Sequence, residues 1–158
     1  MRGWLIDSNV IAELVSPRAN PAVDRWAAAQ DEESLFISVL TLAEYDKGIE
    51  NLPDVDDRRA ALAALRDGLA DRFQDRLLGL SNAIVRRWGG ISGRVRRTTG
   101  HPPPVVDTLL AATAQEFDLY LATRNVKDVK YSGAAVFNPW VDDPARFPLD
   151  RRGGGTQP

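Results

Sequence analysis

The sequence contains no cysteine and only one histidine among its 158 residues. Disulfides, thiolate metal sites and metal sites built from several histidines are therefore excluded. No apolar run approaches the ~20 residues that a membrane-spanning helix needs. The opening MRGWLIDSN is not typical of a signal peptide, because only three apolar residues precede Asp7. We therefore expect a cytoplasmic protein with no membrane anchor.

Acidic residues are missing from one internal stretch. Between Arg76 and Val106 there is no aspartate or glutamate, although the net charge of the whole chain is −2. A basic segment of this kind can follow a phosphate backbone. A solvated helix face would have the same composition, so both interpretations stay open. The candidate RNA-binding residues in the segment are Arg86, Arg87, Arg94, Arg96 and Arg97.

Short apolar runs alternate with longer helical patterns along the chain. The expected strands are residues 3–6, 34–38, 76–80, 119–123 and 134–138. The expected helices are residues 8–15, 20–30, 41–51, 55–73, 82–95 with an interruption near Gly89, and 105–117. Apolar strands that alternate with helices predict an α/β fold with a parallel sheet covered on both faces. We expect one domain over residues 1–148 and a flexible tail over 149–158.

Two acidic residues follow the first two expected strands. Asp7 comes directly after residues 3–6, and Glu44 follows residues 34–38 by a few positions. Ligands of parallel α/β folds bind beyond the carboxyl ends of the strands, which makes both residues site candidates. Each also has a structural interpretation: Asp7 as a helix N-cap, and Glu44 as part of a capping box with Thr41.

Asp107 is the most informative acid in the sequence. On the expected helix 105–117 it shares one face with Leu110, Ala111 and Ala114, so it heads an apolar stripe that faces inward. The helix dipole favours an aspartate in the first turn but does not explain its inward direction. Asn125 and Asp128 follow the fourth expected strand and are either further site residues or ordinary loop residues.

Together these residues predict a metal site at one edge of the sheet. Four anions within ~4–6 Å of one another would repel strongly unless a divalent cation lay among them. Oxygen-only ligand sets suit Mg²⁺ or Mn²⁺, which also take substrate phosphate oxygens as ligands. Such a cluster can activate water for in-line displacement at phosphorus. The residues thus favour a metal-dependent phosphodiesterase.

Four segments resemble, in order and spacing, the motifs of PIN-domain ribonucleases. The likeness spans residues 4–140 and is greatest to the VapC toxins of bacterial toxin–antitoxin pairs, in particular their FitB-like branch, whose members end in a similar TRNxxDF … NPW. The four segments are WLIDSNVIAEL, ISVLTLAEYDKGIE, PPPVVDTLLAATAQEFDLYLATRNVKDV and VFNPW.

The resemblance implies a three-layer α/β/α sandwich with a Mg²⁺ or Mn²⁺ pocket and endonucleolytic cleavage of RNA. It further implies a homodimer, a heterotetramer or larger assembly with a cognate antitoxin, and inhibition by that antitoxin. Asp7, Glu44 and Asp107 match the three main acids, which makes them the expected metal ligands. Asp128 or Asn125 would fill the fourth position and orient the attacking water. Ser8, Asn9 and Thr123 are expected to support the site.

Two other functions fit the same residues. A phosphotransferase could use Asp7 as its nucleophile, but the aspartate usual two residues later is replaced by Asn9. A catalytically weak PIN-fold module could bind RNA or a partner without turnover, because Asn125 supplies no charge at the fourth acidic position. Metal binding measured beside RNA cleavage distinguishes this module from the nuclease.

Overall fold

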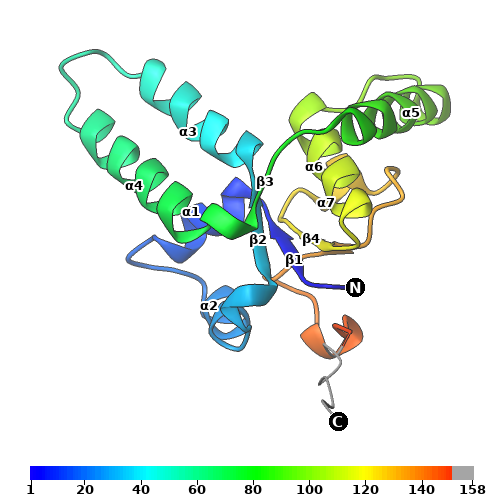
Figure 1. Ribbon diagram of the computed structural model, residues 1–158, viewed down its shortest axis with the longest axis horizontal. Helices are drawn as coiled ribbons and strands as arrows, with labels where there is room; N and C mark the ends of the chain where they lie inside the picture. Colours follow the sequence, from blue (N-terminus) through cyan, green and yellow to red (C-terminus); the bar gives the residue numbers. More distant parts are fainter. Residues whose placement is uncertain (151–158) are drawn as a thin grey trace, which may run out of the picture.

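Five short strands pair in parallel at the centre of the molecule, in the order β3-β2-β1-β4-β5 (Figure 1). The structure is a computed structural model and describes residues 1–150. The strands are β1 Trp4–Ile6, β2 Leu35–Ser38, β3 Leu77–Leu78, β4 Tyr120–Ala122 and β5 Val136–Phe137. In the central pair, Leu5 of β1 lies opposite Leu121 of β4. The expected parallel sheet is confirmed.

Helices cover both faces of this sheet and so form the expected three-layer sandwich (Figure 1). The α-helices are α1 Ser8–Leu14, α2 Pro21–Ala28, α3 Val39–Glu50, α4 Arg58–Arg72, α5 Asn82–Thr99, α6 Val105–Glu116 and α7 Val126–Val129. Three single 3₁₀ turns are η1 Glu32–Ser34, η2 Gln74–Arg76 and η3 Pro144–Arg146.

Successive side chains of the strands point to opposite faces of the sheet, where they form two separate hydrophobic cores. Trp4 and Ile6 of β1 point to the side of α1 and α2, where they pack with Val10 and Trp26. Leu5 points to the other side and packs under α6 and α7. Because buried strands have apolar residues on both faces, their sequences are continuous apolar runs. A third, smaller cluster joins α5 to α6.

The structure differs from the expected elements at three places. Helix α3 begins at Val39 and not at residue 41, after an N-cap at Ser38 whose hydroxyl oxygen accepts from the Leu40 N–H, so the alternative interpretation of Glu44 as part of a capping box with Thr41 is wrong. Helix α5 runs unbroken through Gly89 and ends at Gly100, which adopts a left-handed φ of 80°. The segment after β4 contains the short helix α7, which we expected to be a loop.

The two ends of the described part of the chain, Met1 and Asp150, are in contact. The amino group of Met1 donates to Asp150 Oδ2 at 2.8 Å, and Leu149 packs against the core on the α1–α2 side. The first two residues of the expected tail are therefore held in place. The rest of it, residues 151–158, lies outside the described residues. No helix within residues 1–150 is both long and apolar enough to cross a membrane.

Candidate active site

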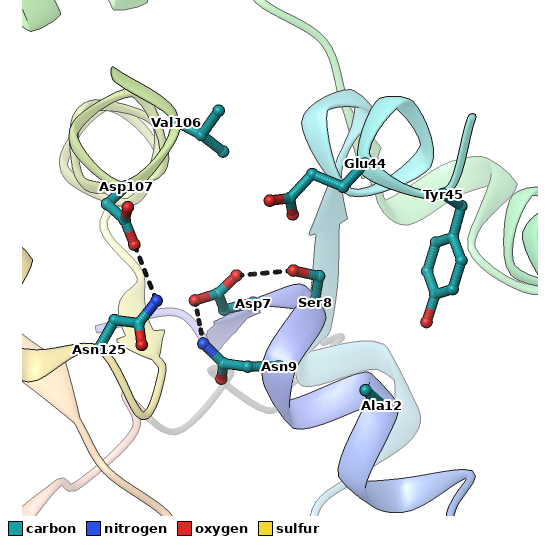
Figure 2. Close-up of a pocket in the computed structure, with 9 residues that line it drawn as sticks. All are labelled: Asp7, Ser8, Asn9, Ala12, Glu44, Tyr45, Val106, Asp107 and Asn125. Carbon is teal, nitrogen blue, oxygen red and sulfur yellow. Dashed lines mark hydrogen bonds between the residues drawn. The ribbon is translucent and has the colours of Figure 1, made fainter. Parts of the chain in front are cut away.

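A pocket of about 330 Å³ opens beyond the carboxyl ends of β1, β2 and β4. Residues from the first turns of α1, α3 and α6 line it, and Figure 2 shows the side chains that surround it. The sequence predicted this edge as the site because the carboxyl ends of parallel strands lie together. The lining residues are Asp7, Ser8, Asn9, Ala12, Glu44, Tyr45, Val106, Asp107 and Asn125.

Asp7 lies at the floor of the pocket, where β1 gives way to α1. It occupies the N-cap position of α1, yet its side chain makes no capping hydrogen bond. Instead its carboxylate accepts hydrogen bonds from the Thr123 hydroxyl at 2.6 Å and from Asn9 Nδ2 at 2.6 Å, both at Oδ2, and from the Ser8 hydroxyl at 3.3 Å. Only 4% of Asp7 is exposed. The carboxylate is thus held in one orientation by neutral donors, without a cation.

Glu44 approaches the pocket from α3, one and a half turns into the helix. Its Oε2 atom is buried and has no hydrogen-bond partner. Burial raises the pKa of Glu44 above its ordinary value, and the charges of Asp7 and Asp107 raise it further. An unpartnered carboxylate oxygen in a buried place is costly. The Ser8 hydroxyl and the charge of Lys47 lower the pKa of Glu44, but they do not outweigh the effect of burial.

Asp107 faces Glu44 from the first turn of α6, across the pocket (Figure 2). The predicted inward face is confirmed, since Leu110, Ala111 and Ala114 are buried. Asn125 Nδ2 donates to Asp107 Oδ1 at 3.2 Å. Burial raises the pKa of Asp107, and the charges of Asp7 and Asp128 add to the rise. Two of the pocket's carboxyls are thus harder to ionise than isolated ones.

The other predicted site residues lie outside the pocket lining. Asp128 is in α7 and acts on Asp107 through its charge. The arginines of α5 are exposed on a helix that packs against α6, and one of them, Arg87, is paired with Glu116 at 2.8 Å. The structure therefore brings together Asp7, Glu44, Asp107 and Asn125 but leaves the α5 arginines away from the pocket.

No three acidic or histidine side chains within residues 1–150 are grouped closely enough to form a ready-made metal cluster. This differs from the expected cluster of four mutually close anions. The neutral donors Thr123 and Asn9 bind the Asp7 carboxylate, while Glu44 and Asp107 lie on opposite walls of the pocket. The donor set is nevertheless all oxygen, and the orphaned Glu44 Oε2 is a free ligand atom. These residues fit a Mg²⁺ or Mn²⁺ ion.

Three lining residues were missed in the sequence: Ala12, Tyr45 and Val106. Helical spacing could have found Ala12, because it lies one turn after Ser8 on the same face of α1. Tyr45 and Val106 are each adjacent to a predicted acid, Glu44 and Asp107. Nothing in their residue types indicated a site, since aliphatic and aromatic side chains are common at any core position.

The fold and the pocket together define a class of protein: a parallel α/β/α sandwich with an acidic, oxygen-lined site at the carboxyl edge of the sheet. The family model described as "PIN domain" matches residues 4–129. The chain belongs to the PIN-domain family.

Individual relatives cover nearly the same part of the chain. Toxin FitB of Neisseria gonorrhoeae (strain ATCC 700825 / FA 1090) is 29% identical over 138 residues, which are 87% of this chain and 99% of FitB. VapC ribonuclease Y4jK of Sinorhizobium fredii (strain NBRC 101917 / NGR234) is 28% identical over 86% of this chain and 96% of its own. The solved structure of FitAB bound to the IR36 DNA fragment superposes with a TM-score of 0.77, at 26% identity, over 89% of this chain and 97% of the matched one.

Proposed function

We propose that this protein is a Mg²⁺- or Mn²⁺-dependent endoribonuclease that acts as the toxin of a type II toxin–antitoxin pair. One observation carries the proposal: Asp7, Glu44 and Asp107 surround a single pocket in which a buried oxygen of Glu44 has no partner. Relatives named as a toxin and as a ribonuclease support the same activity. A cytoplasmic location is part of the proposal, since RNA is the substrate.

Asp7, Glu44 and Asp107 would hold the cation. When bound, Mg²⁺ or Mn²⁺ supplies Lewis acidity at a phosphoryl oxygen and lowers the pKa of water. The protein's own contribution is to fix these ligands. Thr123 and Asn9 fix the Asp7 carboxylate, and Asn125 fixes that of Asp107. Ligands held in this way need little reorganisation during the reaction.

Asn125 is the better placed of the two candidates for orienting the attacking water. Its amide nitrogen is engaged by Asp107, which leaves the amide oxygen able to accept a hydrogen bond from water. Asp128 does not line the pocket and acts on Asp107 through its charge. In the reaction the water oxygen would bond to phosphorus as the ribose oxygen leaves, and one proton of the water would end on that leaving oxygen, so that one P–O bond is exchanged for another.

The partner in this proposal is a cognate antitoxin that covers the pocket and inhibits RNA cleavage. A solved relative, FitAB, is a complex. The pocket also has an apolar margin that suits a partner segment, formed by the lining residue Val106 and by its exposed neighbour Val105. We further propose that the toxin is a homodimer and that it forms a heterotetramer or larger assembly with the antitoxin.

Cleavage of a labelled single-stranded RNA tests the nuclease directly. We expect cleavage with Mg²⁺ or Mn²⁺, none with EDTA, and none for Asp7→Asn, which keeps the side-chain size. Full activity in EDTA or in Asp7→Asn would contradict the proposal. Saturable Mn²⁺ binding without cleavage would instead favour the catalytically weak RNA- or partner-binding module.

The toxin assignment has its own test. Expression of the chain should arrest bacterial growth, and co-expression of a short gene encoded directly upstream should relieve the arrest and yield a stable complex. Growth arrest that the Asp7→Asn variant causes equally would contradict a toxin that acts through RNA cleavage.

A further inference from the structure

An acidic pocket creates an electrostatic difficulty for an enzyme that takes RNA. Its carboxylates repel the phosphates on either side of the bond to be cleaved, even when a cation sits among them. A nuclease therefore needs fixed positive charge next to the pocket to hold the flanking phosphates. The basic helix α5 does not supply it, because its arginines do not line the pocket and Arg87 is neutralised by Glu116.

Arg124 does not line the pocket either, but its backbone lies between two residues that hold carboxylates of the pocket. It follows Thr123, which holds Asp7, and precedes Asn125, which holds Asp107, so its Cα lies about 3.8 Å from the Cα atoms of both neighbours. Its backbone N–H donates to Asn9 Oδ1 at 3.1 Å. The other end of the same Asn9 amide donates to Asp7 Oδ2. Arg124 is therefore anchored to the group that orients the floor of the pocket.

The Arg124 side chain is held on an aromatic platform. Its guanidinium carbon lies 5.2 Å from the centroid of the Trp140 ring, within cation–π range. The main chain that carries Trp140 is fixed: the backbone N–H of Trp140 donates to Asn138 Oδ1 at 3.0 Å, and the backbone N–H of Asn138 donates to Asp142 Oδ2 at 2.7 Å. The ring also packs against the core on the α1–α2 side. A long side chain held in this way loses little conformational entropy on binding.

The donors of this guanidinium are unused. Within residues 1–150, Arg124 has no ion pair and no side-chain hydrogen bond, and the residue is exposed. Six other arginines are engaged with acidic side chains: Arg58, Arg59, Arg66, Arg72, Arg76 and Arg87. A planar guanidinium with free donors matches the paired oxygens of a phosphate. Lys127, three residues on, is also exposed.

We propose that Arg124, held on the face of Trp140, binds a phosphate of the single-stranded RNA next to the phosphate that is cleaved. The proposal rests on the proposed nuclease function and assigns the contact that keeps the strand in register over the acidic pocket. Arg124 then acts by binding substrate and takes no part in the bond exchange itself.

Binding of a labelled single-stranded RNA in EDTA, where no cleavage occurs, tests this proposal. Arg124→Gln, which keeps most of the side-chain length, should raise the Kd about tenfold. It should also reduce the slope of log K against log salt by about 0.7, the value for one phosphate contact on a single strand. Arg124→Lys should keep the slope but recover only part of the affinity, because an ammonium cannot bind two oxygens side by side.

Two further variants separate this contact from general charge and from folding. Arg18→Gln removes an exposed arginine after α1 that does not line the pocket, and should change the Kd less than about twofold. Trp140→Leu removes the ring face but keeps apolar bulk, and should weaken binding by about twofold to fivefold while Arg124 is still present. In Mg²⁺-dependent cleavage, Arg124→Gln should raise KM and leave kcat within about twofold.

The outcomes are distinct. Wild-type-like RNA binding by Arg124→Gln, or an equal loss in Arg18→Gln, overturns the assignment. A loss of antitoxin binding with RNA binding intact overturns it as well, because the contact would then serve the partner. If the wild-type protein neither binds nor cleaves RNA, the proposed nuclease function itself fails. Wild-type cleavage that is lost in Asp7→Asn but indifferent to Arg124→Gln removes only this inference.

Discussion

The aromatic core on one face of the sheet and the pocket at its carboxyl edge are built in opposite ways. On the face of the sheet that α1 and α2 cover, aromatic rings pack on one another. The centroid of the Trp4 ring lies 5.3 Å from that of Trp26 and 4.8 Å from that of Phe137. Beyond the carboxyl ends of the same strands, carboxylates of like charge surround an open pocket. The aromatic region stabilises the fold by burial. The pocket contains partly buried carboxylates of like charge, which lower the stability of the fold.

The two regions differ in what they contribute to stability. Burial and like charges raise the pKa of Glu44 and Asp107. A sheet selected for stability alone would end in neutral or apolar residues at this edge. Unfavourable groups that gather at one place are a functional signal, because stability is given up there for binding or chemistry.

The largest effect is expected in the aromatic region. Phe137 is fully buried against Trp4, Trp26 and Phe147. Phe137→Ala should lower the free energy of unfolding by about 3–5 kcal/mol, since it removes a buried ring and leaves a cavity. Urea titration followed by circular dichroism measures this. Tyr131→Ala, at an aromatic residue that is 51% exposed, is the control and should change stability by less than about 0.5 kcal/mol.

The second effect belongs to the pocket. Asp107→Asn should lower the rate of RNA cleavage at least about a hundredfold, because it removes a ligand charge that neighbouring groups cannot replace. Its unfolding midpoint should not fall. Asp71→Asn, an exposed position on α4, is the matched control and should cleave at the wild-type rate. Loss of stability in step with activity would show that Asp107 is a structural residue instead.

The third effect concerns the groups that hold Asp7. The Thr123 hydroxyl donates to Asp7 Oδ2 at 2.6 Å and is almost fully buried. Thr123→Val keeps the shape and removes the donor, so it should weaken Mn²⁺ affinity about tenfold to a hundredfold. Thr99→Val, at the end of α5, is the control and should leave the affinity unchanged. Unchanged affinity in Thr123→Val would mean that Asp7 needs no help in binding the cation.

The smallest effect is a gain in stability. Without metal, Glu44→Gln should raise the melting temperature by about 1–3 °C at neutral pH, because it removes a charge that the folded state disfavours. The pKa of Glu44 is raised by burial, so its charged form lowers stability above that pKa and the cost disappears as protons bind on acidification. The advantage of the glutamine should therefore shrink as the pH falls. A lower melting temperature for Glu44→Gln in EDTA at neutral pH would contradict the account.

The sequence predicted most of the fold because its signals were local. Apolar runs marked all five strands, and Asn20 was rightly expected to begin a helix, since its side chain accepts from the Ala22 N–H. Two predictions about helices were wrong for physical reasons: the start of α3 and the interruption of α5. The hydroxyl of Ser38 competes with Thr41 as the cap, and packing on α6 holds α5 straight through glycines that a lone helix would tolerate poorly.

The site was predictable to the extent that strand ends determine it. Asp7, Glu44, Asp107 and Asn125 do surround one pocket, because each lies just after a strand or in the first two turns of a helix at the carboxyl edge of the sheet. Their actual separation was not predictable, because it depends on which neutral donors the tertiary structure brings to each carboxylate. Thr123 reaches Asp7 across 116 positions of sequence. The platform of Arg124 on Trp140 likewise joins two loops that only the fold places together.

Calorimetric titration with Mn²⁺ shows whether the carboxylates of the pocket, Asp7, Glu44 and Asp107, form a cation site. The wild-type protein should bind Mn²⁺ saturably, and the same preparation should cleave RNA only when the ion is present. Asp107→Asn should lose the binding heat and the cleavage together, whereas Asp71→Asn should keep both. Equal binding by wild type and Asp107→Asn, or cleavage that persists after the metal is removed, would contradict the account.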